Sequence, residues 1–224
     1  MLILAVDTTT PAGSVALLRD GALLAEFNAE SGLTHSERLL ASVESVLSAA
    51  KRALPDIDGF AVAAGPGSFT GIRIGLSTVK SFCFASGKPG VPVSTLEALA
   101  VKAAGAGGRL LCPMLDAKKG EVYAALFEAR EDAVVEVEPQ GAYDPDAFLK
   151  RLPARRVVHL LGNGALLYRE KVAARLGGRG VILARSPFIG FEVGRIGGAA
   201  LAAGKGVAGA GLQPFYFRKS QAEE

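Results

Sequence analysis

One order of elements is predicted twice along this chain, and that repetition constrains its fold more than any other feature. Apolar runs bounded by turn residues predict strands, and apolar side chains at three- and four-residue steps predict helices. In each copy the order is three strands, a helix, a strand, a Gly-rich turn, a helix, a strand and a helix. The segments of the first copy are strands at 2–6, 14–18, 22–28, 60–64 and 91–93 and helices at 34–51, 68–86 and from 94. Those of the second copy are strands at 110–115, 121–128, 133–137, 157–161 and 181–184 and helices from 144, at 165–176 and at 191–203.

Strands that alternate with helices after an antiparallel hairpin predict an α/β protein, with mixed sheets and helices on both faces. The order of one copy resembles the ribonuclease-H-like fold, and two tandem copies resemble the actin/sugar-kinase/Hsp70 (ASKHA) architecture. The Gly-rich stretch 103–108 is the clearest linker. We therefore expect a first domain at 1–104. A second, smaller domain is expected at 109–224, with a C-terminal helix and tail that can pack back on the first.

Composition narrows the class of function. The 224 residues include 25 basic and 22 acidic side chains, a net charge of +3 that is not typical of a dedicated nucleic-acid binder. Cys83 and Cys112 lie in apolar runs and form no CxxC pair, which suits buried thiols in a reducing compartment. The apolar residues 1–6 end at Asp7 without a basic stretch, so they predict a strand and not a signal peptide. No apolar run approaches the ~20 residues of a membrane span, and a cytoplasmic protein is expected.

A Gly-rich turn, Gly65-Pro66-Gly67-Ser68-Phe69-Thr70-Gly71-Ile72-Arg73-Ile74-Gly75, leads from the strand at 60–64 into the helix at 68–86. It is not a Walker loop, because no Gly-Lys-Ser/Thr follows at the required spacing. It is not a nucleophile elbow, so Ser68 is expected to cap the helix rather than to act as a protease nucleophile. Gly71 and Gly75 form a stripe without side chains, although each interior Gly costs a helix ~1 kcal/mol relative to Ala. The stripe predicts that another backbone comes close, either within the fold or from a partner.

Further short motifs are spread over nearly the whole chain. In chain order they are Ile3-Leu4-Ala5-Val6-Asp7-Thr8-Thr9, His35-Ser36-Glu37, the string at 65–75, Ser94-Thr95-Leu96-Glu97-Ala98-Leu99, Leu115-Asp116-Ala117, Gly120-Glu121-Val122-Tyr123, Gly162-Asn163-Gly164-Ala165 and Pro214-Phe215-Tyr216-Phe217-Arg218. Together they resemble the TsaB (YeaZ) family. The string at 65–75 and its spacing to His35-Ser36-Glu37 are the most specific part of that resemblance.

The resemblance implies a role in making threonylcarbamoyladenosine next to the anticodon of tRNA. It implies a non-catalytic dimerization or scaffold subunit that a TsaD-like enzyme requires and that pairs with it through first-domain helices. A TsaE-like ATPase is expected to bind the assembled pair, tRNA to touch this chain indirectly or weakly, and a homodimer to form when the partner is absent. The implied interface residues are His35, Glu37, Leu39, Ser68, Phe69, Gly71, Ile72, Arg73, Gly75 and Leu76.

A nucleotide-binding enzyme of the same superfold, a phosphotransferase or an ATPase, is the alternative function. Its weak candidate residues are Asp7, Thr9 and Asp116, because the two aspartates end matching first strands. The loops that follow them lack the Gly residues that let a backbone approach phosphates closely, so neither a cofactor nor a catalytic residue is expected.

No metal site is expected either. Catalytic relatives hold their ion with two histidines on the helix that here starts at Thr34, where this chain has only His35. His159 lies in the middle of an apolar strand and is expected to be a core residue. The aromatic and basic tail Phe215–Lys219 is expected to pack on its own domain rather than to contact tRNA.

Overall fold

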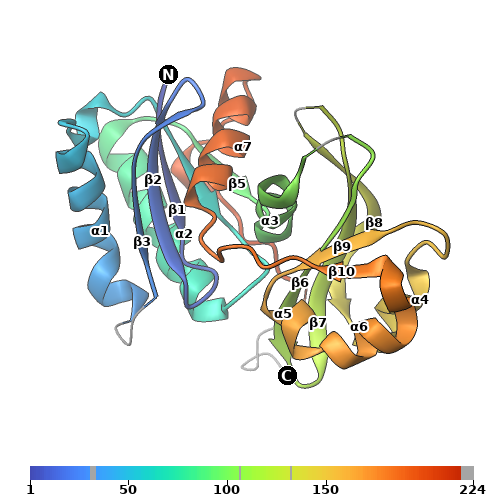
Figure 1. Cartoon of the computed structure of the whole chain (residues 1–224). Coiled ribbons are helices and arrows are strands. Elements are labelled where there is room, and N and C mark those ends of the chain that lie inside the picture. Colours follow the sequence, from blue (N-terminus) through green and yellow to red (C-terminus); the bar gives the residue numbers. More distant parts are fainter. Residues whose placement is uncertain (31–33, 106, 132, 218–224) are drawn as a thin grey trace. The chain divides into compact units, whose positions relative to one another are not determined.

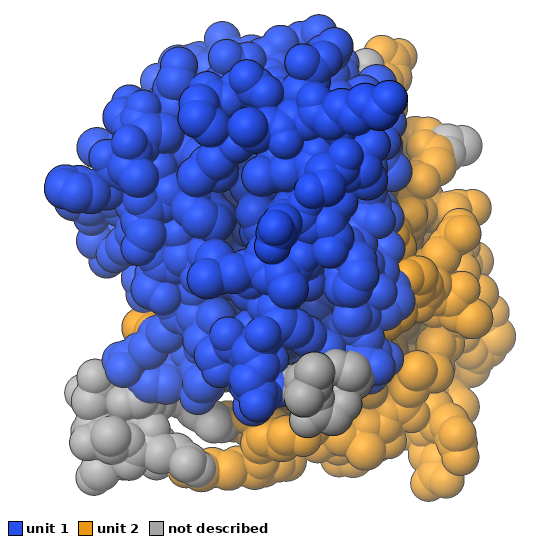
Figure 2. All heavy atoms as spheres, turned by 90° about the vertical axis from the view of Figure 1, so that its left-hand side faces the viewer, with its two compact units in different colours: residues 1–95, 188–215 blue, residues 96–187, 216–224 orange. Residues whose placement is uncertain are grey.

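The computed structural model describes residues 1–30, 34–105, 107–131 and 133–217. The chain divides into two compact units, which Figure 2 distinguishes by colour. Unit 1 comprises residues 1–95 and 188–215, and unit 2 comprises residues 96–187 and the residues from 216 onward. Each unit contains one five-stranded mixed sheet with helices packed on it, so the predicted α/β class is confirmed.

In unit 1 the strand order is β3-β2-β1-β4-β5, with β1 antiparallel to β2 and parallel to β4. The strands are β1 (Leu2–Asp7), β2 (Gly13–Arg19), β3 (Ala22–Ala29), β4 (Gly59–Ala63) and β5 (Gly90–Val93). The helices are α1 (His35–Ala49), α2 (Phe69–Ser86) and α7 (Gly190–Ala202), with short 3-10 turns at Leu54–Asp56 and Gly209–Gly211.

Helices α1 and α2 cover one face of this sheet, and α7 covers the other (Figure 1). The first face is apolar and bulky: Leu4, Val6, Phe60 and Val62 are fully buried in one cluster with side chains of α1 and α2. The second face combines the small side chains Ala5, Ala16 and Ala61 with Ile3 and Leu18, and α7 meets it with glycine. A Cβ added to Gly197, for instance, would overlap with the Cβ of Ala61. The sheet is therefore buried on both faces, which explains why β1 is apolar up to Asp7 and β4 is apolar throughout.

Unit 2 repeats the design with the strand order β10-β9-β6-β7-β8, so its strands occupy the same places as β5-β4-β1-β2-β3 of unit 1. Its strands are β6 (Leu110–Lys118), β7 (Glu121–Ala129), β8 (Val134–Tyr143), β9 (Val158–Leu161) and β10 (Gly180–Ile182). Its helices are α4 (Pro145–Arg151), α5 (Asn163–Leu167) and α6 (Arg169–Leu176), with a 3-10 turn at Gly177–Arg179, while α3 (Thr95–Ala103) begins at the last residue of the first segment of unit 1. Side chains of α4, α5 and α6 share one core with β6, β7 and β9.

The structure differs from the predicted elements in two places. The helix expected at 165–176 is two helices, because Tyr168 between them has a non-helical backbone (φ −103°, ψ 25°). The helix expected at 191–203, α7, packs on the sheet of unit 1 although it follows unit 2 in the sequence. The units consequently divide the chain near Thr95 and Phe188, and not at the linker 103–108.

Candidate functional site

The Gly-rich turn before α2 is built to bring the start of this helix against the turn that follows β1. The Ser68 amide donates to the Thr9 carbonyl (2.7 Å), and the Ser68 hydroxyl accepts from the Gly71 amide (3.3 Å) as the predicted N-cap. The Thr8 hydroxyl in turn donates to the Gly71 carbonyl (2.7 Å). A Cβ on Gly71 would overlap with the Thr8 carbonyl oxygen, and one on Gly75 would lie 2.5 Å from the Thr8 hydroxyl oxygen. The close backbone that the stripe predicted is therefore the chain's own.

Half of the interface residues that the family resemblance implied do not face outward. Gly71 and Gly75 meet Thr8 as described, and the side chains of Leu39, Ile72 and Leu76 are buried in the core beneath α1 and α2. A partner cannot reach these five positions while unit 1 is folded. Their assignment to a partner interface is corrected to a role in the core of unit 1.

His35 and its neighbours hold the β1–β2 turn from the start of α1. Because a carbonyl only accepts, the His35 Nε2 carries a proton and donates to the Thr10 carbonyl (2.7 Å). Because a guanidinium only donates, the His35 Nδ1 accepts from Arg38 (3.1 Å), which also donates to the Pro11 carbonyl (2.7 Å). Burial and the Arg38 charge hold the pKa of His35 below its ordinary value, so the ring is neutral.

The remaining implied interface residues also have contacts within the chain. The Glu37 carboxylate accepts from the amide (2.7 Å) and the hydroxyl (2.6 Å) of Thr34, and these two residues form a capping box at the start of α1. The Arg73 guanidinium stacks 3.8 Å from the centre of the Phe69 ring. Glu37, Ser68 and Arg73 are exposed and Phe69 is half-buried, so these four stay accessible.

Asp7, the first candidate nucleotide ligand, is fully buried. Its Oδ1 accepts from the amide (2.9 Å) and the hydroxyl (2.7 Å) of Thr9, whereas its Oδ2 has no hydrogen-bond partner among the residues that the structure describes. Burial raises its pKa to about 6 despite the Thr9 hydrogen bonds. The cavity that Asp7 lines, together with Ser14, His35 and Arg38, has a volume of about 10 Å³, enough for one water molecule but not for a phosphate.

Asp116, the matching residue of unit 2, is engaged by its neighbour. Lys118 donates to the Asp116 carboxylate through its amide (2.8 Å) and its ammonium group (2.7 Å), and burial raises the pKa of Asp116 less than these bonds lower it. Gly162 and Gly164 approach Met114 and Leu115 so closely that a Cβ would overlap with their backbone atoms. In both units, therefore, glycines that follow the fourth strand (β4 or β9) pack against the end of the first strand (β1 or β6) or the turn after it.

The outward side of α1 and α2 is a candidate protein-docking surface in unit 1. We define the docking face as Leu40, Ala41 and Ser45 of α1 with Arg73, Ser77 and Ser81 of α2, all exposed. Leu40 is 63% exposed, although it is as apolar as the core residue Leu39 beside it. The exposure of Leu40 could have been predicted from the sequence. The apolar stripe that faces the core includes Leu39, and adjacent residues point 100° apart on a helix.

The hydroxyl groups of the docking face are already satisfied by their own helices. Ser45, Ser77 and Ser81 each donate to a carbonyl three or four residues earlier, at 2.8–3.0 Å. A partner that covers these serines leaves no donor unpaired, so the dehydration of their hydroxyl groups costs little free energy.

Two further observations concern other kinds of site. In the described ranges, no three His, Cys, Asp or Glu side chains converge as metal ligands, and no helix is long and apolar enough to cross a membrane. Arg218 and Lys219 of the predicted tail lie outside the described residues.

Comparison with known proteins gives a consistent result. Residues 29–154 match the family model described as TsaD, tRNA N6-adenosine threonylcarbamoyltransferase. The chain is 33% identical over 183 residues to the tRNA threonylcarbamoyladenosine biosynthesis protein TsaB of Bacillus subtilis, which covers 81% of this chain and 80% of that protein. YeaZ from Pseudomonas aeruginosa has a solved structure with a TM-score of 0.83 and 29% identity, covering 96% of this chain and 99% of that one.

A more distant structure shows the fold alone. The activator of the 2-hydroxyisocaproyl-CoA dehydratase from Clostridium difficile is 11% identical, with a TM-score of 0.55 over 92% of this chain and 97% of that one. Together with the repeated strand order, these likenesses confirm the tandem ribonuclease-H-like fold of the ASKHA architecture.

Proposed function

Because the chain belongs to the TsaB (YeaZ) family of tRNA threonylcarbamoyladenosine biosynthesis proteins, we propose that it acts in that tRNA modification as a non-catalytic scaffold. Its docking face binds a TsaD-like enzyme, and in the absence of that enzyme the same face permits a homodimer. A TsaE-like ATPase then binds the assembled pair. The buried thiols of Cys83 and Cys112 suit the cytoplasm, where such a complex would meet tRNA.

The observation that carries this proposal is the pairing of an exposed leucine with self-satisfied serines on two neighbouring helices. Burying Leu40 in an interface contributes about 1.5–3 kcal/mol of favourable free energy. Covering Ser45, Ser77 and Ser81 removes little, because their hydroxyls keep their helix carbonyls. Such a face favours a protein partner over water without requiring a matching set of polar groups.

The non-catalytic part of the proposal is supported by the state of the candidate nucleotide residues. Asp7 and Thr9 are buried, the cavity that Asp7 lines is too small for phosphate, and Asp116 is paired with Lys118. A scaffold promotes catalysis by its partner only if it binds the partner's active conformation more tightly than the inactive one. We assign that differential binding to the docking face.

The test compares Leu40→Asp with Leu166→Asp, because these leucines are 63% and 58% exposed and lie in different units. Each variant is mixed with the TsaD-like enzyme, analysed by size-exclusion chromatography, and assayed for tRNA modification with the TsaE-like ATPase. We expect Leu40→Asp to weaken binding by about tenfold or more and to slow modification, since a carboxylate replaces a buried apolar contact. Leu166→Asp should behave like the unmodified chain.

Two results would overturn the proposal. Undiminished binding and modification by Leu40→Asp would exclude the docking face as the interface. ATP hydrolysis by the purified chain alone would instead favour the nucleotide-binding enzyme.

A further inference from the structure

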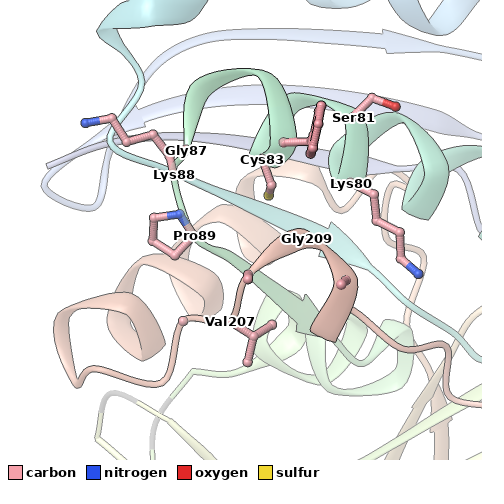
Figure 3. A pocket seen from close by; sticks show the side chains of 12 residues that line it. Lys80, Ser81, Cys83, Gly87, Lys88, Pro89, Val207 and Gly209 are labelled. Carbon is pink, nitrogen blue, oxygen red and sulfur yellow. The ribbon is translucent and has the colours of Figure 1, made fainter.

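A groove of about 820 Å³ opens in unit 1, on the side of α2 where its last two turns face the segment 206–210 (Figure 3). Its walls are held in place by short-range contacts. Val207 and Gly90 exchange two backbone hydrogen bonds (2.8 and 2.9 Å), which attach the segment to β5. Gly209 lies so close to α2 that a Cβ there would come within 3.0 Å of the Lys80 carbonyl oxygen. The groove is therefore a formed feature of unit 1.

The side chains that line the groove combine apolar walls with positive charge. Figure 3 shows Lys80 and Lys88 toward opposite ends, with Pro89 and Val207 between them. Phe84, another lining residue, is 91% exposed, the most of any large apolar side chain among the described residues. No carboxylate belongs to the lining, and within the described part of the chain neither lysine forms an ion pair.

The two lysines and the apolar residues between them indicate what kind of ligand the groove can bind. Two separated ammonium groups attract a ligand with negative charge at both ends, and the apolar wall between them rejects charge in the middle. A nucleic-acid strand has a phosphate at every nucleotide and would place some of them on the apolar wall. A peptide can alternate, with acidic side chains at the lysines and an aromatic or aliphatic side chain against Phe84 and Val207.

We propose that this groove binds a short acidic segment of a partner protein, anchored by an aromatic or aliphatic side chain between carboxylates. The groove shares Ser81 with the docking face, whereas Lys80, Phe84 and Lys88 belong to the groove alone and Leu40 lies outside it. Binding in the groove consequently does not depend on the proposed scaffold function. The Leu40→Asp variant leaves it intact, so the two proposals succeed or fail separately.

The experiment is a selection from a displayed library of random dodecapeptides on the immobilised full chain, with counter-selection on the double variant Lys80→Glu/Lys88→Glu. The expected consensus is one aromatic or large aliphatic residue flanked by Asp or Glu. The best peptide, labelled with fluorescein, should bind the double variant and Phe84→Ser at least about tenfold more weakly in fluorescence anisotropy. Added salt should weaken binding because both lysines are only half-buried and remain open to screening by ions.

Matched controls are Lys150→Glu and Leu167→Ser, which make the same types of change on exposed side chains of unit 2 and should not alter binding. Phe84→Ser changes an exposed side chain, and an unaltered circular-dichroism melt verifies that it folds. The proposal is refuted if counter-selection leaves no consensus, if the consensus is neutral or basic, or if the variants retain affinity. Phe84-dependent binding of a single-stranded uridine oligonucleotide in place of any peptide would assign the groove to nucleic acid.

Discussion

At the scale of single residues, buried polar groups of unit 1 fix the turn after β1. Asp7, Thr8 and Thr9 are almost completely buried, and their side-chain hydrogen bonds tie this turn to itself, to α2 and to Thr95. Of the buried side-chain oxygen and nitrogen atoms in the described residues, only the Asp7 Oδ2 lacks a hydrogen-bond partner. An unpaired buried oxygen on an ionised carboxylate is costly, and this cost makes the stability of the protein sensitive to pH.

Asp7→Asn is expected to stabilise the protein at pH 7.5. The folded-state pKa of Asp7 is about 6, above its usual 3.8, so between these values the folded chain binds more protons than the unfolded chain. Stability contributed by this group therefore rises as pH falls from about 7 toward 4, and ionised Asp7 costs about 3 kcal/mol above pH 7. The asparagine has no such cost, so its advantage in urea unfolding should be largest at pH 7.5 and should shrink toward pH 4.

The control for this prediction is Asp146→Asn, which removes an exposed carboxylate paired with Lys171 and should change stability by less than about 1 kcal/mol. A less stable Asp7→Asn variant at pH 7.5 would mean that the carboxylate has a stabilising partner, and the raised pKa would be wrong.

At the scale of elements, both units have a glycine-containing turn that leads from their fourth strand into a helix. In unit 1 this is the turn before α2. The sequence was sufficient to predict the strand, the turn, the Ser68 cap and the close approach of a second backbone. It could not identify that backbone. The spacing of Gly71 and Gly75 shows that one side of the helix lacks side chains, but it does not show which part of the chain packs against that side. Thr8 is 63 residues away from Gly71 in the sequence, and only the folded sheet brings them together.

Gly71→Ala is expected to destabilise unit 1. On an exposed helix face the same change would add ~1 kcal/mol of stability through helix propensity. Here the new Cβ would overlap with a backbone carbonyl that cannot rotate away, and such overpacking costs about 1–3 kcal/mol. Urea unfolding should show a lower midpoint, while Ser77→Ala on the outer side of the same helix should remain within about 0.5 kcal/mol of the unmodified chain. If Gly71→Ala stabilised the protein, Gly71 would have to face solvent and not the Thr8 carbonyl.

At the scale of the whole molecule, unit 1 is assembled from two stretches of chain that enclose most of unit 2 in the sequence. The repeat predicted the strands of both units and their order, because each local pattern is complete within a few residues. It counted α7 with the second domain and left open that this helix packs back on the first, because the pattern of an amphipathic helix does not say which sheet it covers. The deciding feature is the match between the glycines of α7 and the small side chains Ala5, Ala16 and Ala61.

A chain that ends after residue 187 is expected to keep unit 2 folded and to lose unit 1. It lacks α7 and also Leu212, which is fully buried in the core under α1 and α2. Hydrogen-exchange mass spectrometry should find β6, β7 and β9 protected and β1 and β4 unprotected. The matched control ends after residue 217 and should retain protection in both units. Persistent protection of β1 in the shorter chain would mean that residues 1–95 fold alone.

The late position of α7 has a consequence for how the protein is made. The ribosome releases the five strands of unit 1 first, and their small-residue face stays uncovered until residues 96–187 have been synthesised. At roughly 5–20 residues per second, that interval lasts on the order of 5–20 s. During this time an apolar sheet face is open to chaperones and to other nascent chains, while unit 2 emerges with all of its strands in sequence. Unit 2 can thus finish folding before the unit that was begun first, and codons that slow translation between residues 96 and 187 prolong the period in which the nascent chain can aggregate.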